Sequence, residues 1–161
     1  MSNTQTKKLV VTTPSDREIQ MVRAFDAPRD LVFKAFTDPE LIPKWWGPRN
    51  TTTVVDTLEL RAGGKWRFLN IESDGTEHAF RGEFREIVPP SRIVWTFEYE
   101  PWAGHVTVET STFEEQDGKT TVTTVSVFDS VEDRDGMLNS GMETGAGESY
   151  DRLDELLATL K

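Results

Sequence analysis

The chain has 161 residues, the size of one typical domain, and its 36% hydrophobic and 29% charged residues are typical of a globular protein. Its net charge of −10 at pH 7 argues against nucleic acids and anionic membrane surfaces as partners. The sequence contains no cysteine, which excludes disulfides and thiolate chemistry within it, and no apolar run long enough to insert into a membrane.

The N-terminal residues are expected to precede the folded part of the chain. Residues 1–15 are largely polar and lack the apolar stretch of a signal peptide, so we expect a flexible leader there and a cytoplasmic protein. Residues 16–161 contain no internal repeat and no linker rich in glycine, serine or proline. We therefore expect them to form a single domain.

The domain begins with a strand and two helices. Apolar residues alternate with polar ones over 18–25, which predicts a strand. Asp-Ala-Pro at 26–28 combines a capping carboxylate with a proline suited to the first helical turn, and predicts a helix through Phe36. The same signal at 37–39 predicts a second short helix that ends near Gly47.

Residues 51–129 change to a period of two. Five turn signals rich in glycine, proline and aspartate divide this stretch, which predicts six consecutive antiparallel strands. In most of them large apolar side chains alternate with charged ones, so one face of the sheet is aromatic and the other faces water. The last two strands, 106–113 and 120–128, are rich in valine and threonine, so the sequence does not decide which of their faces is buried.

After residue 129 the apolar period returns to 3.6, which predicts one long amphipathic C-terminal helix. A curved sheet with one aromatic face must be covered, and only this helix is long enough to cover it. The predicted fold is α+β, a helix-grip in which a curved seven-stranded antiparallel sheet wraps around the C-terminal helix. Its element order is one strand, two helices, six strands and the long helix.

Two glycines of the predicted helix leave two interpretations open. Gly141 and Gly145 lie one turn apart on the stripe that should face the sheet, although a helical glycine costs about 1 kcal/mol relative to alanine. They either let the helix press against the sheet or leave room for a ligand. The aromatic side chains of the sheet allow the same alternatives, because large aromatic residues either fill a core or line a cavity.

Catalytic patterns are sparse. His78 and His105 do not have metal-ligand spacing, so we expect no metal, and neither a nucleophile elbow nor a phosphate-binding glycine loop is present. We therefore expect no cofactor. Asp56 and Glu86 share the parity of apolar neighbours and are candidate acid or base groups in a pocket. The alternative is that β-bulges turn both outward or that each pairs with an arginine.

A set of motifs carries a family resemblance that covers about residues 18–160. They are 25–33 (FDAPRDLVF), 37–40 (TDPE), 44–48 (KWWGP), 63–68 (GGKWRF), 80–90 (FRGEFREIVPP) and 141–145 (GMETG). Together they resemble bacterial proteins similar to the C-terminal domain of the activator of heat-shock-protein-ninety ATPase. That family belongs to the START-like (SRPBCC, Bet v 1-like) helix-grip superfamily. The resemblance implies a cavity between the sheet and the long helix, which different members use for apolar ligands or for polyketide cyclisation, and it transfers no catalytic set.

The leading hypothesis is a binding protein for a hydrophobic or aromatic small molecule in that cavity. The expected site residues lie on the aromatic sheet face and on the C-terminal helix. They are Trp66, Phe68, Phe84, Trp95, Phe97, Met137, Gly141, Met142 and Gly145.

Two other functions are carried as alternatives. One is a cyclase-like or aromatase-like enzyme that uses Asp56, Glu86 or a tyrosine as the acid or base. The other is an interaction domain like that of the chaperone-ATPase activator, with Trp45, Trp46 and Trp102 as exposed anchors for a chaperone or a second copy. A free edge strand is compatible with either a monomer or a weak homodimer.

Overall fold

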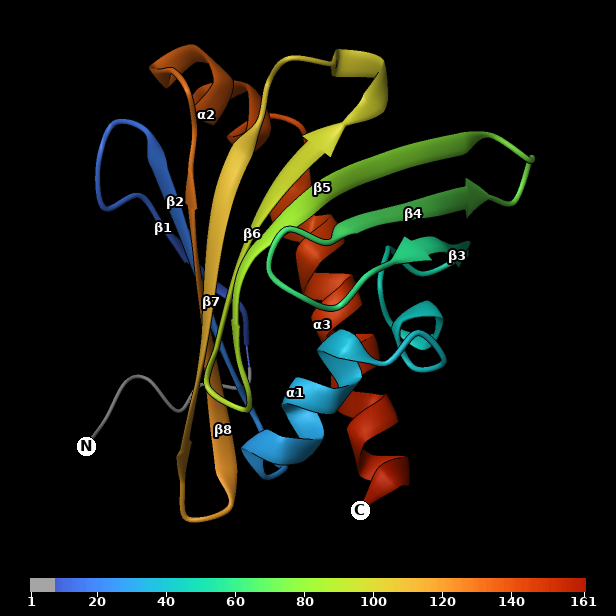
Figure 1. Ribbon diagram of the computed structural model, residues 1–161, viewed down its shortest axis with the longest axis vertical. Coiled ribbons are helices and arrows are strands. Elements are labelled where there is room, and N and C mark those ends of the chain that lie inside the picture. Colours follow the sequence, from blue (N-terminus) through green and yellow to red (C-terminus); the bar gives the residue numbers. More distant parts are fainter. Residues whose placement is uncertain (1–7) are drawn as a thin grey trace.

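One eight-stranded antiparallel sheet dominates the computed structural model, which describes residues 8–161 (Figure 1). Its strands are β1 (Val10–Thr12), β2 (Glu18–Phe25), β3 (Thr51–Leu58), β4 (Lys65–Glu72), β5 (Glu77–Val88), β6 (Arg92–Tyr99), β7 (Thr107–Gln116) and β8 (Lys119–Val127). They lie in the order β1-β2-β8-β7-β6-β5-β4-β3, so the N-terminal strands join the six-stranded meander at β8. The predicted α+β helix-grip is confirmed.

The sheet has one strand more than the seven predicted. The additional strand β1 falls inside the leader expected over 1–15, and it pairs with β2 through Val10 opposite Val22. Three residues are too few to show a period in the sequence, and the strand forms because the edge of β2 offers unpaired backbone groups. Residues 1–7 of the expected leader lie outside the described residues.

The helices are α1 (Arg29–Thr37), α2 (Val131–Leu138) and α3 (Met142–Leu160), with 3-10 turns at Ile42–Lys44 and Glu100–Trp102. The first helix starts directly after Pro28, as predicted. The second helix predicted near residue 39 is only the 3-10 turn Ile42–Lys44, because Pro43 has no backbone N–H to continue an α-helix. Within residues 8–161, no helix has the length and apolar character needed to cross a membrane.

The single C-terminal helix predicted after residue 129 is two helices. Ser130 caps α2 by accepting a hydrogen bond from the Asp133 backbone N–H at 3.1 Å. The chain then turns at Gly141, whose φ of +83° is left-handed, before α3 begins at Met142. Glycine adopts this conformation without the steric cost that other residues have, so Gly141 marks a break and not a helix interior.

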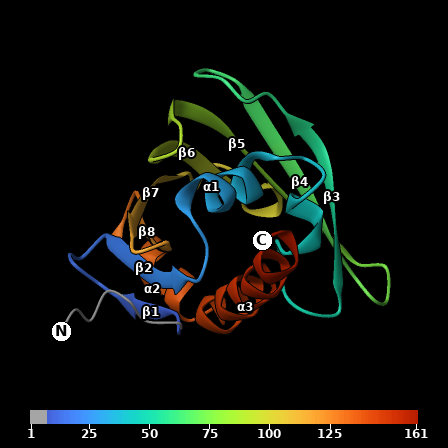
Figure 2. The same ribbon diagram turned by 90° about the horizontal axis from the view of Figure 1, so that it is seen from below.

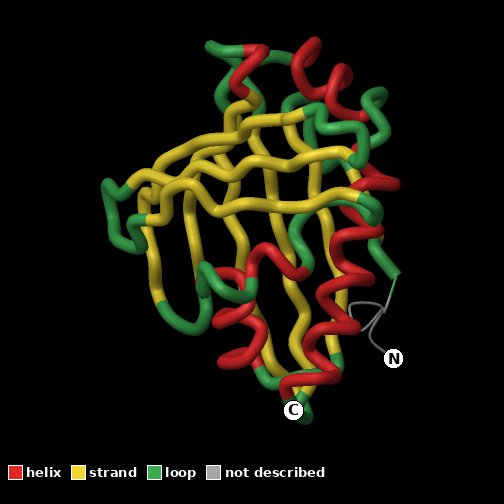
Figure 3. Tube along the Cα trace, turned by 90° about the vertical axis from the view of Figure 1, so that its right-hand side faces the viewer, coloured by secondary structure: helices red, strands yellow, loops and turns green. Residues whose placement is uncertain are grey.

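The sheet curves around α3, and α1 lies beside α3 inside the same arc (Figure 2). Figures 1 and 3 place α2 at the upper end of the strands and α1 toward the lower end. Between α1, α3 and the sheet, apolar side chains pack into a core in which Phe36 and Phe113 meet edge to face at 5.1 Å. The core therefore fills one end of the grip.

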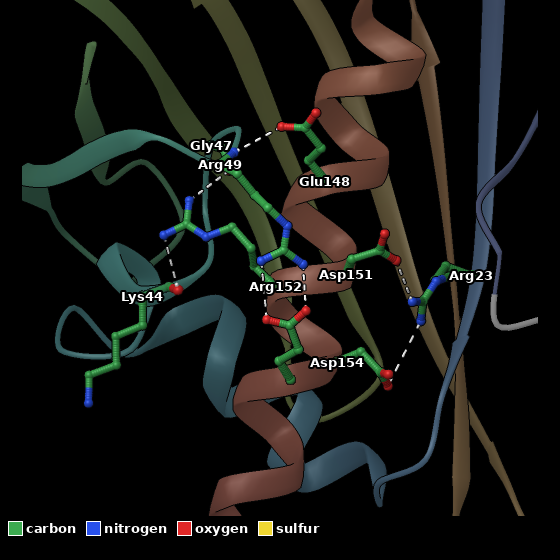
Figure 4. Close-up of polar contacts among 9 residues, drawn as sticks. Arg23, Lys44, Gly47, Arg49, Glu148, Asp151, Arg152 and Asp154 are labelled. Carbon is green, nitrogen blue, oxygen red and sulfur yellow. Dashed lines mark hydrogen bonds and ion pairs between the residues drawn. The ribbon is translucent and has the colours of Figure 1, made fainter. Parts of the chain in front are cut away.

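Polar contacts fix α3 on two sides (Figure 4). On β2, the buried Arg23 donates through Nη2 to Asp151 Oδ1 at 2.9 Å, and its Nη1 lies 4.0 Å from Asp154 Oδ1. On the other side, Arg152 Nη1 donates to the carbonyl oxygen of Gly47 at 2.9 Å. These contacts set the distance between α3 and the sheet, and with it the space between them.

Candidate ligand-binding cavity

A cavity of about 810 Å³ lies between the concave face of the sheet and α3. Side chains from β2, β5, β6, β7, β8, α2 and α3 line it. Its exposed lining residues, Trp102, Gly136 and Ser140, belong to α2 and the neighbouring turns, whereas the buried residues Trp45 and Tyr150 close it from the core. The cavity therefore opens at the α2 end of the molecule.

Most of the wall is apolar and aromatic. Phe80 on β5 and Trp95, Phe97 and Tyr99 on β6 form one side, and Trp46 packs edge to face on Phe80 at 5.3 Å. The methionines contribute three further lining side chains, which are Met21, Met137 and Met142. Methionine is unbranched and polarizable, so a wall of this composition adapts to apolar ligands of different shapes.

The wall formed by β7 and β8 is polar. We call Glu109, Ser111, Thr124 and Ser126 the polar floor, since all four line the cavity. In the β7–β8 pairing Glu109 lies opposite Ser126 and Ser111 opposite Thr124. Ser126 Oγ donates to Glu109 Oε2 at 3.0 Å, and the hydroxyl oxygens of Ser111 and Thr124 are 2.8 Å apart. Four adjacent polar side chains therefore interrupt an otherwise apolar cavity.

Burial shifts the titration of two groups at this floor. The pKa of Glu109 is raised by burial, against which the hydrogen bond from Ser126 acts in the opposite direction. Burial also raises the pKa of Tyr150 on α3 to about 12, although a hydrogen bond with Thr124 and the charge of Arg23 lower it. The surroundings thus favour the neutral forms of both groups.

Trp95 has a buried polar atom without a partner. Its indole Nε1 makes no hydrogen bond to any described residue, although most buried donors in proteins are paired. The Trp95 ring is stacked on Phe84 with a centroid distance of 5.7 Å, and Trp95 lies directly opposite Glu109 in the β6–β7 pairing. The unpaired donor and the half-buried carboxyl of Glu109 are therefore cross-strand neighbours.

The structure places the nine site residues expected from the sequence in three environments. Those that line the cavity are Trp95, Phe97, Met137, Met142 and Gly145. Trp66, Phe68 and Phe84 are buried in the core, behind the cavity wall, and the Trp66 indole donates to the Thr96 carbonyl oxygen at 3.0 Å. Gly141 is exposed at the start of α3.

The two glycines do not serve close packing of the helix on the sheet. A Cβ atom at Gly141 would meet nothing within 4 Å, and one at Gly145 would meet only Pro48 Cγ, at 3.8 Å. Gly145 lines the cavity instead. Of the two interpretations left open by the sequence, the contacts around Gly145 fit the one in which a small residue leaves room beside the helix.

Asp56 and Glu86 both lie outside the cavity. The pairing of β3 with β4 shifts between Val55 and Thr57, and that of β5 with β6 shifts between Phe84 and Glu86. These bulges leave both carboxylates exposed, with Asp56 3.5 Å from Arg67 Nη1 and Glu86 accepting from Arg92. The carboxyl group of the cavity is Glu109, which the sequence analysis missed.

A signal for the polar floor is visible in the sequence once the inward parity is known. Glu109 and Ser111 alternate toward the buried Phe113, and Thr124 and Ser126 alternate from the buried Val122. The surrounding valines and threonines suit either face of a strand and concealed this pattern. In the described part of the chain, no group of three or more histidine, aspartate or glutamate side chains could hold a metal ion.

The three tryptophans considered as interface anchors have different environments. Trp45 is 3% exposed and donates to the Ala35 carbonyl oxygen at 2.9 Å, and Trp46 is half-buried on the cavity wall. Only Trp102 is well exposed, at 45%, and its ring is stacked on His105 with centroids 3.9 Å apart. His105 Nδ1 lies 2.9 Å from Asp133 Oδ2, which ties this turn to α2 at the cavity mouth.

Comparisons with known proteins place the chain in a family. The family model described as Activator of Hsp90 ATPase homolog 1-like protein matches residues 26–158. The chain belongs to this family. Among curated proteins, none matches the sequence significantly.

Solved structures support the same fold. The crystal structure of a Rhodobacter sphaeroides protein has a TM-score of 0.87 at 25% identity, covering 96% of this chain and 100% of that one. An NMR structure from Arthrobacter aurescens gives 0.85 at 27% identity, covering 93% and 91%. An HSP90 activator from Plasmodium falciparum gives 0.53 at 21% identity, covering 69% and 72%, and this likeness shows the fold alone.

Proposed function

We propose that the protein binds a hydrophobic or aromatic small molecule in the cavity between the sheet and α3. The observation that carries this proposal is the space itself, about 810 Å³ that the side chains leave open beside aromatic walls. Ligand pockets are typically ~300–1,000 Å³, mostly apolar, with a few polar groups that orient the ligand. The polar floor around Glu109 supplies such groups.

The mouth of the cavity supports the same function. Trp102 and Met137 flank it from two different elements, and the hydrogen bond between His105 and Asp133 holds these elements together. An exposed tryptophan at an opening gives an apolar ligand a first contact before it reaches the interior.

The two alternative functions have less support from the residues first assigned to them. A cyclase-like enzyme would need its acid or base in the cavity, and Asp56 and Glu86 are both on the outer surface. Of the third candidate type, tyrosine, Tyr99 and Tyr150 line the cavity. The family name points to activation of a chaperone ATPase. Of the three proposed anchors for such a partner, however, Trp45 is buried and Trp46 faces the cavity.

Titration with Nile red, a neutral dye whose fluorescence rises in apolar surroundings, tests this proposal. Ala146 lines the cavity from α3, so Ala146→Phe fills part of the space, whereas Ala158→Phe adds the same ring to an exposed position of that helix. We expect saturable binding that weakens about tenfold or more in Ala146→Phe, because the added ring displaces the dye, and is unchanged in Ala158→Phe.

Native mass spectrometry and amide NMR shifts add two independent readouts. The expected shifts cluster at Phe97, Met137 and the first turns of α3. Absence of any bound molecule from a panel of lipids, flavonoids and polyketide-like aromatics, together with unmoved amides, would contradict the proposal. Equal binding by Ala146→Phe and the unaltered protein would place the dye outside the cavity.

A further inference from the structure

The cavity wall contains one acidic side chain and, among the described residues, no lysine or arginine side chain. Glu109 is the only aspartate or glutamate among its lining residues, and no described lysine or arginine lines it. The one histidine among the lining residues is His78, whose ring nitrogens are already bonded to Tyr99 at 2.8 Å and Glu72 at 2.6 Å. An anionic ligand would therefore find no unpaired cation on the wall.

Glu109 itself makes the wall unfavourable for an anion. Its only hydrogen bond within residues 8–161 is the one from Ser126, which leaves accepting capacity on the carboxyl group. The charged side chain of Arg23 is also buried, but it does not line the cavity. Its Nη groups are directed to Asp151, Asp154 and the Ala24 carbonyl oxygen, and its Nε has no partner among the described residues. No second carboxylate could be placed here without either repulsion from Glu109 or protonation of one of the two groups.

Neutral polar groups surround Glu109 on three elements. Ser126 lies beside it on β8, Tyr150 on α3 is near enough for the charge of Glu109 to raise the pKa of its hydroxyl, and Trp95 lies opposite it on β6 with a buried, unpaired indole N–H. Ser111 and Thr124 continue this polar region along the floor. A hydroxyl group on a ligand both donates and accepts, and so it complements a carboxyl oxygen together with neighbouring N–H and O–H groups.

We propose that the cavity selects apolar or aromatic ligands with a neutral hydroxyl head group and discriminates against the corresponding carboxylates. The hydroxyl lies against the polar floor and donates to Glu109, while the apolar body occupies the aromatic side of the cavity. This inference rests on the proposed function. It narrows the ligand to alcohols and phenols and excludes free fatty acids and aromatic acids as preferred ligands.

Four probes with one naphthalene body test the selectivity by isothermal titration calorimetry at neutral pH. They are 2-(2-naphthyl)ethanol, the carboxylate anion of 2-naphthylacetic acid (the acetate), 2-(2-naphthyl)ethylammonium (the ammonium) and 2-ethylnaphthalene, which has no polar head group. We expect the alcohol to bind about tenfold or more tightly than the acetate, because the acetate either meets an ionised Glu109 or requires its protonation, and no cation on the wall compensates the charge of the ligand. We also expect the alcohol to bind more tightly than the ammonium, which would have to form a desolvated ion pair.

The variant Glu109→Gln identifies the group responsible. It keeps the size of the side chain and removes its charge, so we expect the preference for alcohol over acetate to fall below about threefold, mainly through tighter binding of the acetate. The control Glu114→Gln removes the same charge at an exposed position of β7 and should keep the full preference. Neither variant should change the affinity for 2-ethylnaphthalene.

The outcomes separate the two proposals. If 2-ethylnaphthalene binds and the acetate or the ammonium equals or exceeds the alcohol, the head-group assignment is overturned and the cavity remains a binding site. The same holds if Glu109→Gln leaves the preference intact. If none of the four probes binds, both proposals fail together.

Discussion

Trp95 and Glu109 face each other across neighbouring strands β6 and β7, and both side chains line the same cavity. Directly opposed residues in an antiparallel pair have Cβ atoms about 5 Å apart, so these two side chains form one part of the cavity wall. One side chain has a buried donor without a partner and the other has a carboxyl whose pKa is raised by burial. Neither feature stabilises the empty fold, which is why this pair is central to the functional account.

The raised pKa of Glu109 predicts a pH dependence of stability. A group with a higher pKa in the folded state contributes its stabilisation fully below the unfolded pKa and loses it as pH rises through the folded value. Compared with the unaltered protein, Glu109→Gln should therefore gain stability as pH rises through this range. Urea unfolding at a series of pH values measures the difference.

Glu83→Gln should show the opposite pH dependence of stability and serves as the control for Glu109→Gln. Lys65 lowers the pKa of the Glu83 carboxyl through a hydrogen bond and its charge. The unaltered protein therefore gains stability from this pair as pH rises from the lowered pKa of the folded state through the ordinary pKa of the unfolded state. Relative to it, the variant should lose stability over that range. Parallel curves for the two variants would contradict the surroundings assigned to Glu109.

Gly82 is required for the packing of Trp66. A Cβ atom at position 82 would lie 1.9 Å from the Thr96 carbonyl oxygen and 2.5 Å from Trp66 Nε1, the two atoms that form a hydrogen bond. We expect Gly82→Ala to destabilise the protein by about 3 kcal/mol, through overpacking and the loss of this bond.

A second glycine provides the control for Gly82. Gly136 lies in α2, and a Cβ atom there would meet nothing within 4 Å. Gly136→Ala should be neutral or stabilise by up to about 1 kcal/mol, because alanine has the higher helix propensity. Thermal and urea unfolding of both variants measure the contrast, and similar effects at the two positions would be inconsistent with these contacts.

Core and cavity phenylalanines should respond differently to truncation. Phe84 is 1% exposed and stacked on Trp95, so Phe84→Ala should cost about 3–5 kcal/mol of unfolding free energy. Phe97 is half-buried and lines the cavity, so Phe97→Ala should cost less than half as much but weaken Nile red binding several-fold. Equal losses of stability would show that Phe97 belongs to the core.

Substitutions on the two sides of the contact between Arg23 and α3 should have unequal effects on stability. Arg23 is 3% exposed, whereas its partner Asp151 is 59% exposed. The double variant Asp151→Asn/Asp154→Asn leaves the buried guanidinium without compensating charge, and we expect a loss of about 3 kcal/mol. Arg23→Met should cost less, because it replaces the buried charge with an apolar chain and returns the carboxylates to water. Urea unfolding distinguishes these results, and the reverse order would contradict them.

The period of the apolar residues is enough to predict the helix-grip and its meander. Two local features of the fold could not be predicted from it. β1 depends on an edge of β2 that its own three residues do not encode. The division between α2 and α3 depends on the left-handed conformation of Gly141, which the apolar period passes over without a gap.

The site was predictable only where side-chain direction followed strict alternation. Trp95 and Phe97 obey it and line the cavity, while Trp66, Phe68 and Phe84 share the sheet face and lie in the core instead. Strand alternation alone does not distinguish a residue in the core from one on the cavity wall, because the position of α3 decides which part of the sheet face is covered. The bulges next to Asp56 and Glu86 reverse the direction of both carboxylates, and one-residue shifts of this kind leave no signature in the period.

The decisive experiment is a crystal structure of the protein with 2-(2-naphthyl)ethanol. We expect the naphthalene ring between Phe97 and α3, with its hydroxyl within hydrogen-bond distance of the Glu109 carboxyl. A probe bound outside the cavity, or an interior closed by side chains around Trp95 and Met142, would contradict the claim that this space is a ligand-binding site.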